Sequence, residues 1–171
     1  VLYGYGSREE LTQAGADALA ESPEAGVFLV QTVGEFKEKT EKSKLDLQIK
    51  KPEEPIYIMA DGRHFWRVID NLMNNICKYA QPGTRVYLSL ERIGNSAVII
   101  FRNTSREALN ISEEELMERF VRGDASRTTE GNGLGLSIAR SLAELQGGKL
   151  TIKIDGDLFK AILTFPVLNE R

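Results

Sequence analysis

Hydrophobic residues recur with helical spacing in three stretches of the chain. In the longest, residues 61–80, they recur every three or four positions behind Asp61, which predicts a capped helix with one buried face. Its apolar positions are Phe65, Val68, Ile69, Leu72, Met73 and Ile76. The same spacing predicts an amphipathic helix over 27–42, with Val27, Val30 and Val33 in its buried stripe, and a helix over 136–145 that closes on Gly147-Gly148. Ser112, with Glu115 three residues later, predicts the start of a further short helix.

Alternating apolar and polar residues predict strands between these helices. The predicted strands cover 45–50, 56–59, 85–90, 97–101, 150–154 and 159–165. Gly94-Asn95 and 155–157 have the composition of hairpin turns, so the last four strands form two hairpins. The order of elements predicts an α/β (α+β) two-layer sandwich, in which helices cover one face of a mixed β-sheet.

Composition narrows the class of protein. The 171 residues fit one domain, and 42% hydrophobic residues suffice for a core. A net charge of −3 does not favour a nucleic-acid surface, so we expect no nucleic-acid partner. With the single cysteine Cys77 no disulfide can form within the chain, which favours a reducing, cytoplasmic location, and no apolar run reaches the length of a membrane span. We expect the domain over 27–171, and a linker or remnant of a neighbouring domain over 1–26, with a short helix at 8–20.

Three glycines at alternate positions, Gly131, Gly133 and Gly135, lead directly into the predicted helix at 136–145. Backbone amides can approach an anion closely at glycine, and a helix N-terminus adds unpaired N–H groups and partial positive charge. The stretch therefore has the composition of a phosphate cradle. Taken alone, this pattern is a weak signal, because an ordinary loop before a core helix has the same composition.

A stripe of polar residues accompanies the buried face of the helix predicted over 61–80. Asn71, Asn75 and Lys78 stand at i, i+4 and i+7, on one side of that helix. The alternative is an exposed polar face, but asparagine is a poor helix former, and the cluster with Asn74 favours a function. The residues at 121–133 are polar and rich in glycine, which predicts a mobile loop.

Four stretches together resemble the catalytic ATP-binding domain of bacterial sensor histidine kinases, within the superfamily of gyrase, mismatch-repair and chaperone ATPases. NLMNNICKYA (71–80) resembles its asparagine box, and ERFVRGDASR (118–127) its phenylalanine box and lid. GNGLGL (131–136) resembles its second glycine box, and VIIFRNTS (98–105) occupies the place of the first. The resemblance covers roughly residues 27–168 and implies the two-layer fold with a mobile ATP lid.

The resemblance assigns roles around Mg²⁺ and ATP. Asn75 would give an amide oxygen to Mg²⁺, and Asn71 would help to hold the metal and its water. Lys78 would contact phosphate and, with Asn71, serve catalysis, while Tyr79 would pack near the adenine. The residues of the lid and glycine box that would contact the nucleotide are Arg122, Arg127, Gly131, Gly133, Leu134, Gly135 and Leu136. Phe120 would anchor the lid.

The chain departs from the family pattern at the first glycine box. Asn103 stands where the family has an aspartate that accepts a hydrogen bond from the adenine amino group, and Thr104 replaces the following glycine. An asparagine oxygen accepts the same bond without charge assistance. The departure puts nucleotide affinity in question.

The resemblance also bears on the reaction. Water-activating members carry a glutamate where this chain has Asn71, which cannot act as a general base. Transfer to an external nucleophile needs mainly positioning and charge neutralisation. That nucleophile would be a histidine on a separate dimerisation domain, and the parent kinase would act on a response regulator. The only histidine here, His64, lacks the family's acceptor context, so we interpret it as a surface or packing residue, and Cys77 and Trp66 likewise.

We expect a membrane-anchored parent chain and a monomeric isolated domain. Two alternatives remain at this point. A degenerate nucleotide-binding or scaffolding module would explain Thr104, and a serine kinase of the anti-sigma type shares the same boxes.

Overall fold

The computed structural model describes residues 23–121 and 135–168, with the side chains of 118–121 excepted. The short helix predicted at 8–20 and the loop predicted at 121–133, apart from its first residue, lie outside the described residues. Within the described ranges, no helix has the length and apolar character needed to cross a membrane.

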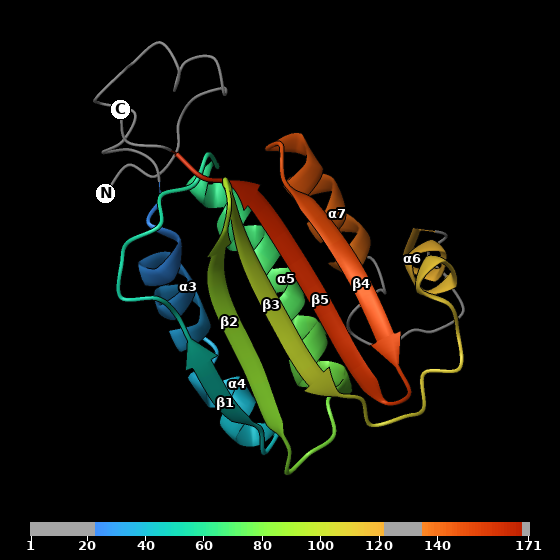
Figure 1. Ribbon diagram of the computed structural model, residues 1–171. Coiled ribbons are helices and arrows are strands. Elements are labelled where there is room, and N and C mark those ends of the chain that lie inside the picture. The colour runs from blue at the N-terminus through green and yellow to red at the C-terminus, as the bar shows by residue number, and fades with distance from the viewer. Residues whose placement is uncertain (1–22, 122–134, 169–171) are drawn as a thin grey trace.

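A five-stranded mixed sheet carries the fold, in the order β1-β2-β3-β5-β4. Its strands are β1 (Asp46–Lys50), β2 (Arg85–Ile93), β3 (Ser96–Thr104), β4 (Lys149–Asp155) and β5 (Leu158–Pro166). Strand β1 pairs parallel with β2, and the remaining pairs are antiparallel. The helices are α3 (Ala25–Gly34), α4 (Lys37–Lys42), α5 (Gly62–Tyr79), α6 (Glu113–Val121) and α7 (Gly135–Leu145). Helices α3, α5 and α7 cover one face of the sheet, which confirms the two-layer prediction (Figure 1).

Helix α5 lies at the centre of the core. The Asp61 carboxylate accepts the backbone N–H groups of Arg63 and His64, so the predicted cap is confirmed. The side chain of Phe65 is fully buried between Phe28 of α3, with ring centroids 5.1 Å apart, and Phe165 of β5, at 5.3 Å in an edge-to-face arrangement. Burial of this apolar stripe fixes which side of α5 faces the sheet, and therefore where its polar stripe lies.

The helix predicted over 27–42 is in fact two helices, α3 and α4. The predicted stripe is correct for Val33, which is 1% exposed, and wrong for Val27 and Val30, which are 48% and 40% exposed. The residues that α3 buries are Ala25, Gly26, Phe28, Leu29, Thr32 and Val33. The chain leaves helical geometry at Phe36, whose side chain is only 4% exposed. Turning the chain at this point keeps Phe36 in the core while α4, which is mostly charged, stays at the surface.

Two strand predictions also need correction. Residues 56–59 form no strand, because Tyr57 and Ile58 make only isolated bridges, to Glu24 and Val167. Ile58 is nevertheless fully buried, so its apolar character reflects packing rather than ladder pairing. The strand predicted at 97–101 extends to Thr104, which places Asn103 inside β3 and not beyond its end.

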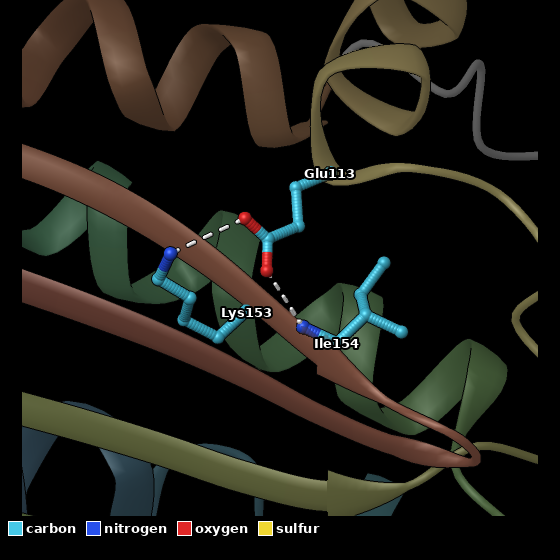
Figure 2. Close-up of polar contacts among 3 residues, drawn as sticks. All are labelled: Glu113, Lys153 and Ile154. Carbon is cyan, nitrogen blue, oxygen red and sulfur yellow. Dashed lines mark hydrogen bonds and ion pairs between the residues drawn. The ribbon is translucent and has the colours of Figure 1, made fainter.

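Helix α6 is attached to the outer edge of the sheet. Its first turn is capped as predicted, with the Glu115 N–H donating to Ser112 Oγ at 3.0 Å. Glu113 reaches the edge strand β4, where one carboxylate oxygen accepts the Ile154 N–H at 3.1 Å and the other lies 3.4 Å from Lys153 Nζ (Figure 2). This carboxylate therefore accepts a hydrogen bond from a backbone N–H of an edge strand and holds the start of α6 against β4.

Candidate functional site

The polar stripe of α5 lies beside the first turn of α7. Asn71, Asn75 and Lys78 are half-buried. A methyl group built on Gly135, the first residue of α7, would come within 3.9 Å of both the backbone oxygen and Oδ1 of Asn71. The structure thus brings the asparagine stripe and the N-terminus of α7 together, as the motifs predict, although the two are far apart in the sequence.

One polar atom in this stripe has no partner. Asn71 Nδ2 is buried and makes no hydrogen bond within the described part of the chain. A buried donor left unsatisfied costs about 1–3 kcal/mol, so the site contains a local cost that a bound group can remove. Helix α7 has eleven residues, and its N-terminal N–H groups add partial positive charge beside Asn71.

The third asparagine of the cluster has a different task. Asn74 Oδ1 accepts a hydrogen bond from Lys39 Nζ at 2.8 Å, which joins α5 to α4. Asp70 faces the same neighbours: partial burial raises its pKa, and the nearby charge of Lys39 acts in the opposite direction. The residues on this side of α5 therefore serve helix packing, and Asp70 is directed away from Asn71.

The C-terminal end of α5 is joined to the end of β3. The Arg106 N–H donates to the carbonyl oxygen of Tyr79, and the Gln81 N–H donates to that of Thr104, both at 2.8 Å. The Lys78 ammonium lies 5.1 Å from the centroid of the Tyr79 ring, which is 40% exposed. These contacts place the last turn of α5, with Lys78 and Tyr79, beside the strand that carries Asn103.

Asn103 is the second unpartnered polar group. Its side chain is 4% exposed, and its Oδ1 accepts no hydrogen bond from any described residue. An unpaired acceptor at this depth fits a ligand that donates a hydrogen bond. The next residue, Thr104, lies in regular strand geometry opposite Leu158, with no positive φ. The replacement of glycine at this position therefore creates no backbone strain.

One candidate residue does not present its side chain to a ligand, and others lie outside the described residues. The Leu136 side chain is 1% exposed and packs in the core, so only its backbone remains available to a ligand. The candidates outside the described residues are Arg122, Arg127, Gly131, Gly133 and Leu134, together with the side chain of Phe120.

The three residues that we interpret as surface or packing residues, Trp66, His64 and Cys77, have environments that fit this interpretation. Trp66 Nε1 donates to Glu35 Oε2 at 3.1 Å, and His64 lies in the first turn of α5 beneath the Asp61 cap. Partial burial raises the pKa of the Cys77 thiol, which disfavours the reactive thiolate. No cluster of three or more His, Cys, Asp or Glu side chains suited to a metal ion occurs among the described residues.

The residues present fit a metal-chelated nucleotide at two points. Amide oxygens are acceptable ligands for Mg²⁺, a hard cation that is usually held by few protein groups together with phosphates and water. The unpartnered Asn71 Nδ2 lies on α5 beside the anion-favouring N-terminus of α7, and the unpartnered Asn103 Oδ1 lies on β3, whose end is bonded to the C-terminal end of α5. The first point thus suits phosphate and the second a hydrogen-bond donor.

Known proteins match this chain in sequence and in fold. Residues 60–168 match the family described as histidine kinase-, DNA gyrase B-, and HSP90-like ATPase. The chain is 36% identical over 101 residues to the probable sensor protein PcoS of Escherichia coli, covering 58% of this chain and 22% of that protein. It is 31% identical over 144 residues to the sensor histidine kinase RppB of Synechocystis, covering 80% of this chain and 32% of that protein.

The fold is shared with solved catalytic domains. The catalytic domain of histidine kinase ThkA superposes with a TM-score of 0.72 at 23% identity, covering 85% of this chain and 93% of that chain. The chain belongs to the histidine kinase-, DNA gyrase B- and HSP90-like ATPase family. The two curated relatives named above are a probable sensor protein and a sensor histidine kinase, and this chain spans only 22% to 32% of their length.

Proposed function

We propose that this domain binds Mg·ATP and transfers the γ-phosphoryl group to a histidine on a separate dimerisation domain of its parent kinase. The P–O bond to the β-phosphate breaks, a P–N bond to the imidazole forms, and ADP leaves. The parent then acts on a response regulator. The observation that carries the proposal is the asparagine stripe of α5, set against the N-terminus of α7 with Asn71 Nδ2 unpartnered.

Each residue of the stripe has a task in this proposal. The Asn75 amide oxygen binds Mg²⁺, and Asn71 orients the metal and its water. Lys78 neutralises phosphate charge, and the backbone N–H groups at Gly135 and Leu136 receive phosphate oxygens. When bound, Mg²⁺ supplies charge neutralisation for the triphosphate. Gly131, Gly133 and Leu134 complete this cradle, and Arg122 and Arg127 contact the phosphates from the lid.

The adenine end depends on β3 and the last turn of α5. The unpartnered Asn103 Oδ1 accepts a hydrogen bond from the adenine amino group, and Tyr79 packs near the base. Guanine presents an oxygen where adenine presents this amino group, so an acceptor at Asn103 favours ATP over GTP.

The arrangement favours transfer over hydrolysis. The residue in the position of a water-activating base is Asn71, which cannot take a proton, and the neighbouring Asp70 is directed toward Lys39 and Asn74. Activation of water therefore lacks a base on this side of α5, while an external imidazole brings its own nucleophilic nitrogen. We assign 27–171 to this domain and 1–26 to a linker or a remnant of a neighbouring domain. We place the domain on the cytoplasmic side of a membrane-anchored parent, monomeric when isolated and without a nucleic-acid partner.

The test is calorimetric titration with a non-hydrolysable ATP analogue, with and without Mg²⁺, on the wild type and two variants. Asn75→Asp puts a carboxylate beside the triphosphate, and we expect it to abolish Mg²⁺-dependent binding while the melting temperature stays near that of the wild type. Asn74→Asp is the matched control, because it adds the same charge on the α4 side, next to Lys39. Wild-type affinity in Asn75→Asp would refute the metal assignment.

The second candidate is a module that binds a partner without using ATP, which the replacement of glycine by Thr104 favours. Absence of binding at millimolar nucleotide would establish it over the kinase. A serine kinase of the anti-sigma type is the remaining alternative. If the domain transfers phosphate from labelled ATP, the acid stability of the product distinguishes the two kinases, since phosphoserine survives acid and phosphohistidine does not.

A further inference from the structure

The face of the sheet opposite the helices is covered by no described element (Figure 1). Along β3, Ala97, Ile99, Phe101 and Asn103 are buried toward the helices. The alternate residues of β3, including Ile100 and Arg102, therefore belong to the uncovered face and are half-buried. The same alternation places Tyr87 of β2 and Lys160 of β5 on this face.

Three cations stand side by side on this face. Arg102 pairs with Lys160 in the β3–β5 register, and Lys160 pairs with Lys153 in the β4–β5 register. We call Arg102, Lys160 and Lys153 the cationic row. Side chains at directly opposed positions lie close together, and like charges there are destabilising. Three neighbouring cations are therefore unfavourable for the folded sheet, and they occur in a chain whose net charge is −3.

The row is only partly neutralised. Lys153 is neutralised at one end by Glu113, with Nζ 3.4 Å from the carboxylate. The Arg102 guanidinium lies 5.6 Å from the centroid of the Tyr87 ring, but its Nε is buried with no hydrogen-bond partner. Within the described ranges, no carboxylate lies within ion-pair distance of Arg102 or Lys160. The centre of the row therefore has unmet donors and uncompensated charge.

A hollow of about 250 Å³ opens next to Arg102 on this face. Its lining consists of Arg85, Tyr87, Arg102, Asn103, Thr104 and Leu158. Arg85 at its margin is partly engaged by Asp46, with Nε 3.6 Å from the carboxylate. A guanidinium beside an aromatic ring at the margin of a concave surface is suited to a planar carboxylate.

We propose that the cationic row and the hollow beside Arg102 dock an acidic segment of a partner protein, with one carboxylate in the hollow and another at Lys160. Neighbouring strands lie about 4.8 Å apart, so the row spans about 10 Å. Alternate residues of an extended peptide project about 7 Å apart on one side, so two carboxylates fit within this span. The cationic row lies on the face of the sheet opposite α5 and its asparagine stripe, and the hollow shares only Asn103 and Thr104 with the end of β3 that we assign to the adenine. The proposal does not depend on the proposed function.

The dimensions of the row favour a peptide over other anions. Nucleic-acid surfaces are much broader and carry a strong basic excess, whereas this chain has a net charge of −3. Attachment to an anionic membrane through a basic cluster usually involves about four to eight Lys or Arg residues, more than the three of the row. These two classes of partner are therefore outcomes of the test rather than the proposal.

The test is fluorescence anisotropy with a fluorescein-labelled peptide in which glutamate alternates with glycine, and a matched peptide with glutamine in place of glutamate. We expect the glutamate peptide to bind and the glutamine peptide not to bind. Lys160→Gln and Arg102→Gln should each weaken binding about tenfold, since a charge-assisted hydrogen bond contributes at least the equivalent of one decade of affinity. Lys37→Gln, which removes one exposed cation from α4 on the other layer, is the matched control and should bind as the wild type does.

A second measurement separates docking from folding. Lys160→Gln relieves like-charge repulsion, so its melting temperature should equal or exceed that of the wild type, and its nucleotide titration should be unchanged. Equal affinity of the glutamate peptide for Lys160→Gln and wild type would overturn the proposal. The proposal would also fail if a double-stranded oligonucleotide or phosphatidylglycerol vesicles displaced the glutamate peptide from the cationic row and bound more tightly than the peptide.

Discussion

Glu113 and Ile154 are hydrogen-bonded across 41 positions of sequence, with the Ile154 N–H donating to the Glu113 carboxylate at 3.1 Å (Figure 2). Strand β4 is the last strand of the sheet, so this N–H would otherwise face the open edge. The same carboxylate starts the acidic first turn of α6, where negative charge also favours the helix N-terminus. One side chain therefore links the edge of the sheet to α6, the helix that precedes the predicted lid.

Removing this link should loosen α6 and the β4 edge locally. Glu113→Ala leaves the Ile154 N–H without its partner, and we expect a loss of about 1–2 kcal/mol in the free energy of unfolding. Glu113→Gln keeps an acceptor for Ile154 and loses only the exposed ion pair with Lys153, for which less than about 1 kcal/mol is expected. Denaturant unfolding measures both, and hydrogen exchange at Ile154 reports the local effect. Unchanged exchange at Ile154 in Glu113→Ala would show that the contact has no structural weight.

Asn103→Asp should lower the stability of the free domain and raise its affinity for ATP. A buried carboxylate without a partner is unfavourable, so the variant should melt below the wild type when no nucleotide is present. With ATP bound, the adenine amino group donates to a charged acceptor, and we expect affinity to rise about tenfold. Thermal shift with ATP and with GTP measures both effects. Asn103→Leu is the comparison, and it should lose the preference for ATP over GTP; an equal response of both variants to the two nucleotides would exclude Asn103 from base recognition.

Asp70 predicts a pH dependence of stability. Partial burial raises the pKa of its carboxyl group, although the Lys39 charge lowers it. A carboxyl whose folded-state pKa exceeds its unfolded value contributes stability below the unfolded pKa, and that contribution is lost as the pH rises through the folded pKa. Asp70→Asn should therefore be more stable than the wild type at neutral pH and nearly equal to it in acid. Urea unfolding over this range measures the difference, and a variant that is less stable at neutral pH would show that the Lys39 attraction dominates.

Gly148 is required by space rather than by backbone conformation. A Cβ at this position would lie 2.8 Å from both the Phe165 ring and the Thr164 carbonyl oxygen, and Phe165 is fully buried. Gly148→Ala should therefore cost about 1–3 kcal/mol in the free energy of unfolding. Gly34→Ala is the control, because nothing lies within 4 Å of its Cβ position at the end of α3, and alanine should stabilise there by up to about 1 kcal/mol. Equal melting temperatures for the two variants would contradict this packing.

Local signals in the sequence determined much of the fold. The Asp61 and Ser112 caps lie within three residues of the N–H groups they accept, and the apolar spacing of α5 follows from the helical repeat itself. The boundaries of these helices, the two hairpins and the class of the fold therefore follow from neighbours in sequence. The same is true of the asparagine stripe, since i, i+4 and i+7 share one side of any helix.

Tertiary packing decided the rest, because the relevant partners are distant in sequence. Asn71 and Asn74 are three residues apart, yet one lies beside Gly135 and the other is bound to Lys39. The pairing order of the strands sets Arg102 against Lys160, and the depth of β3 leaves Asn103 without a partner. Each of these relationships depends on which surfaces are buried together, and burial is a property of the assembled core rather than of any segment of the chain.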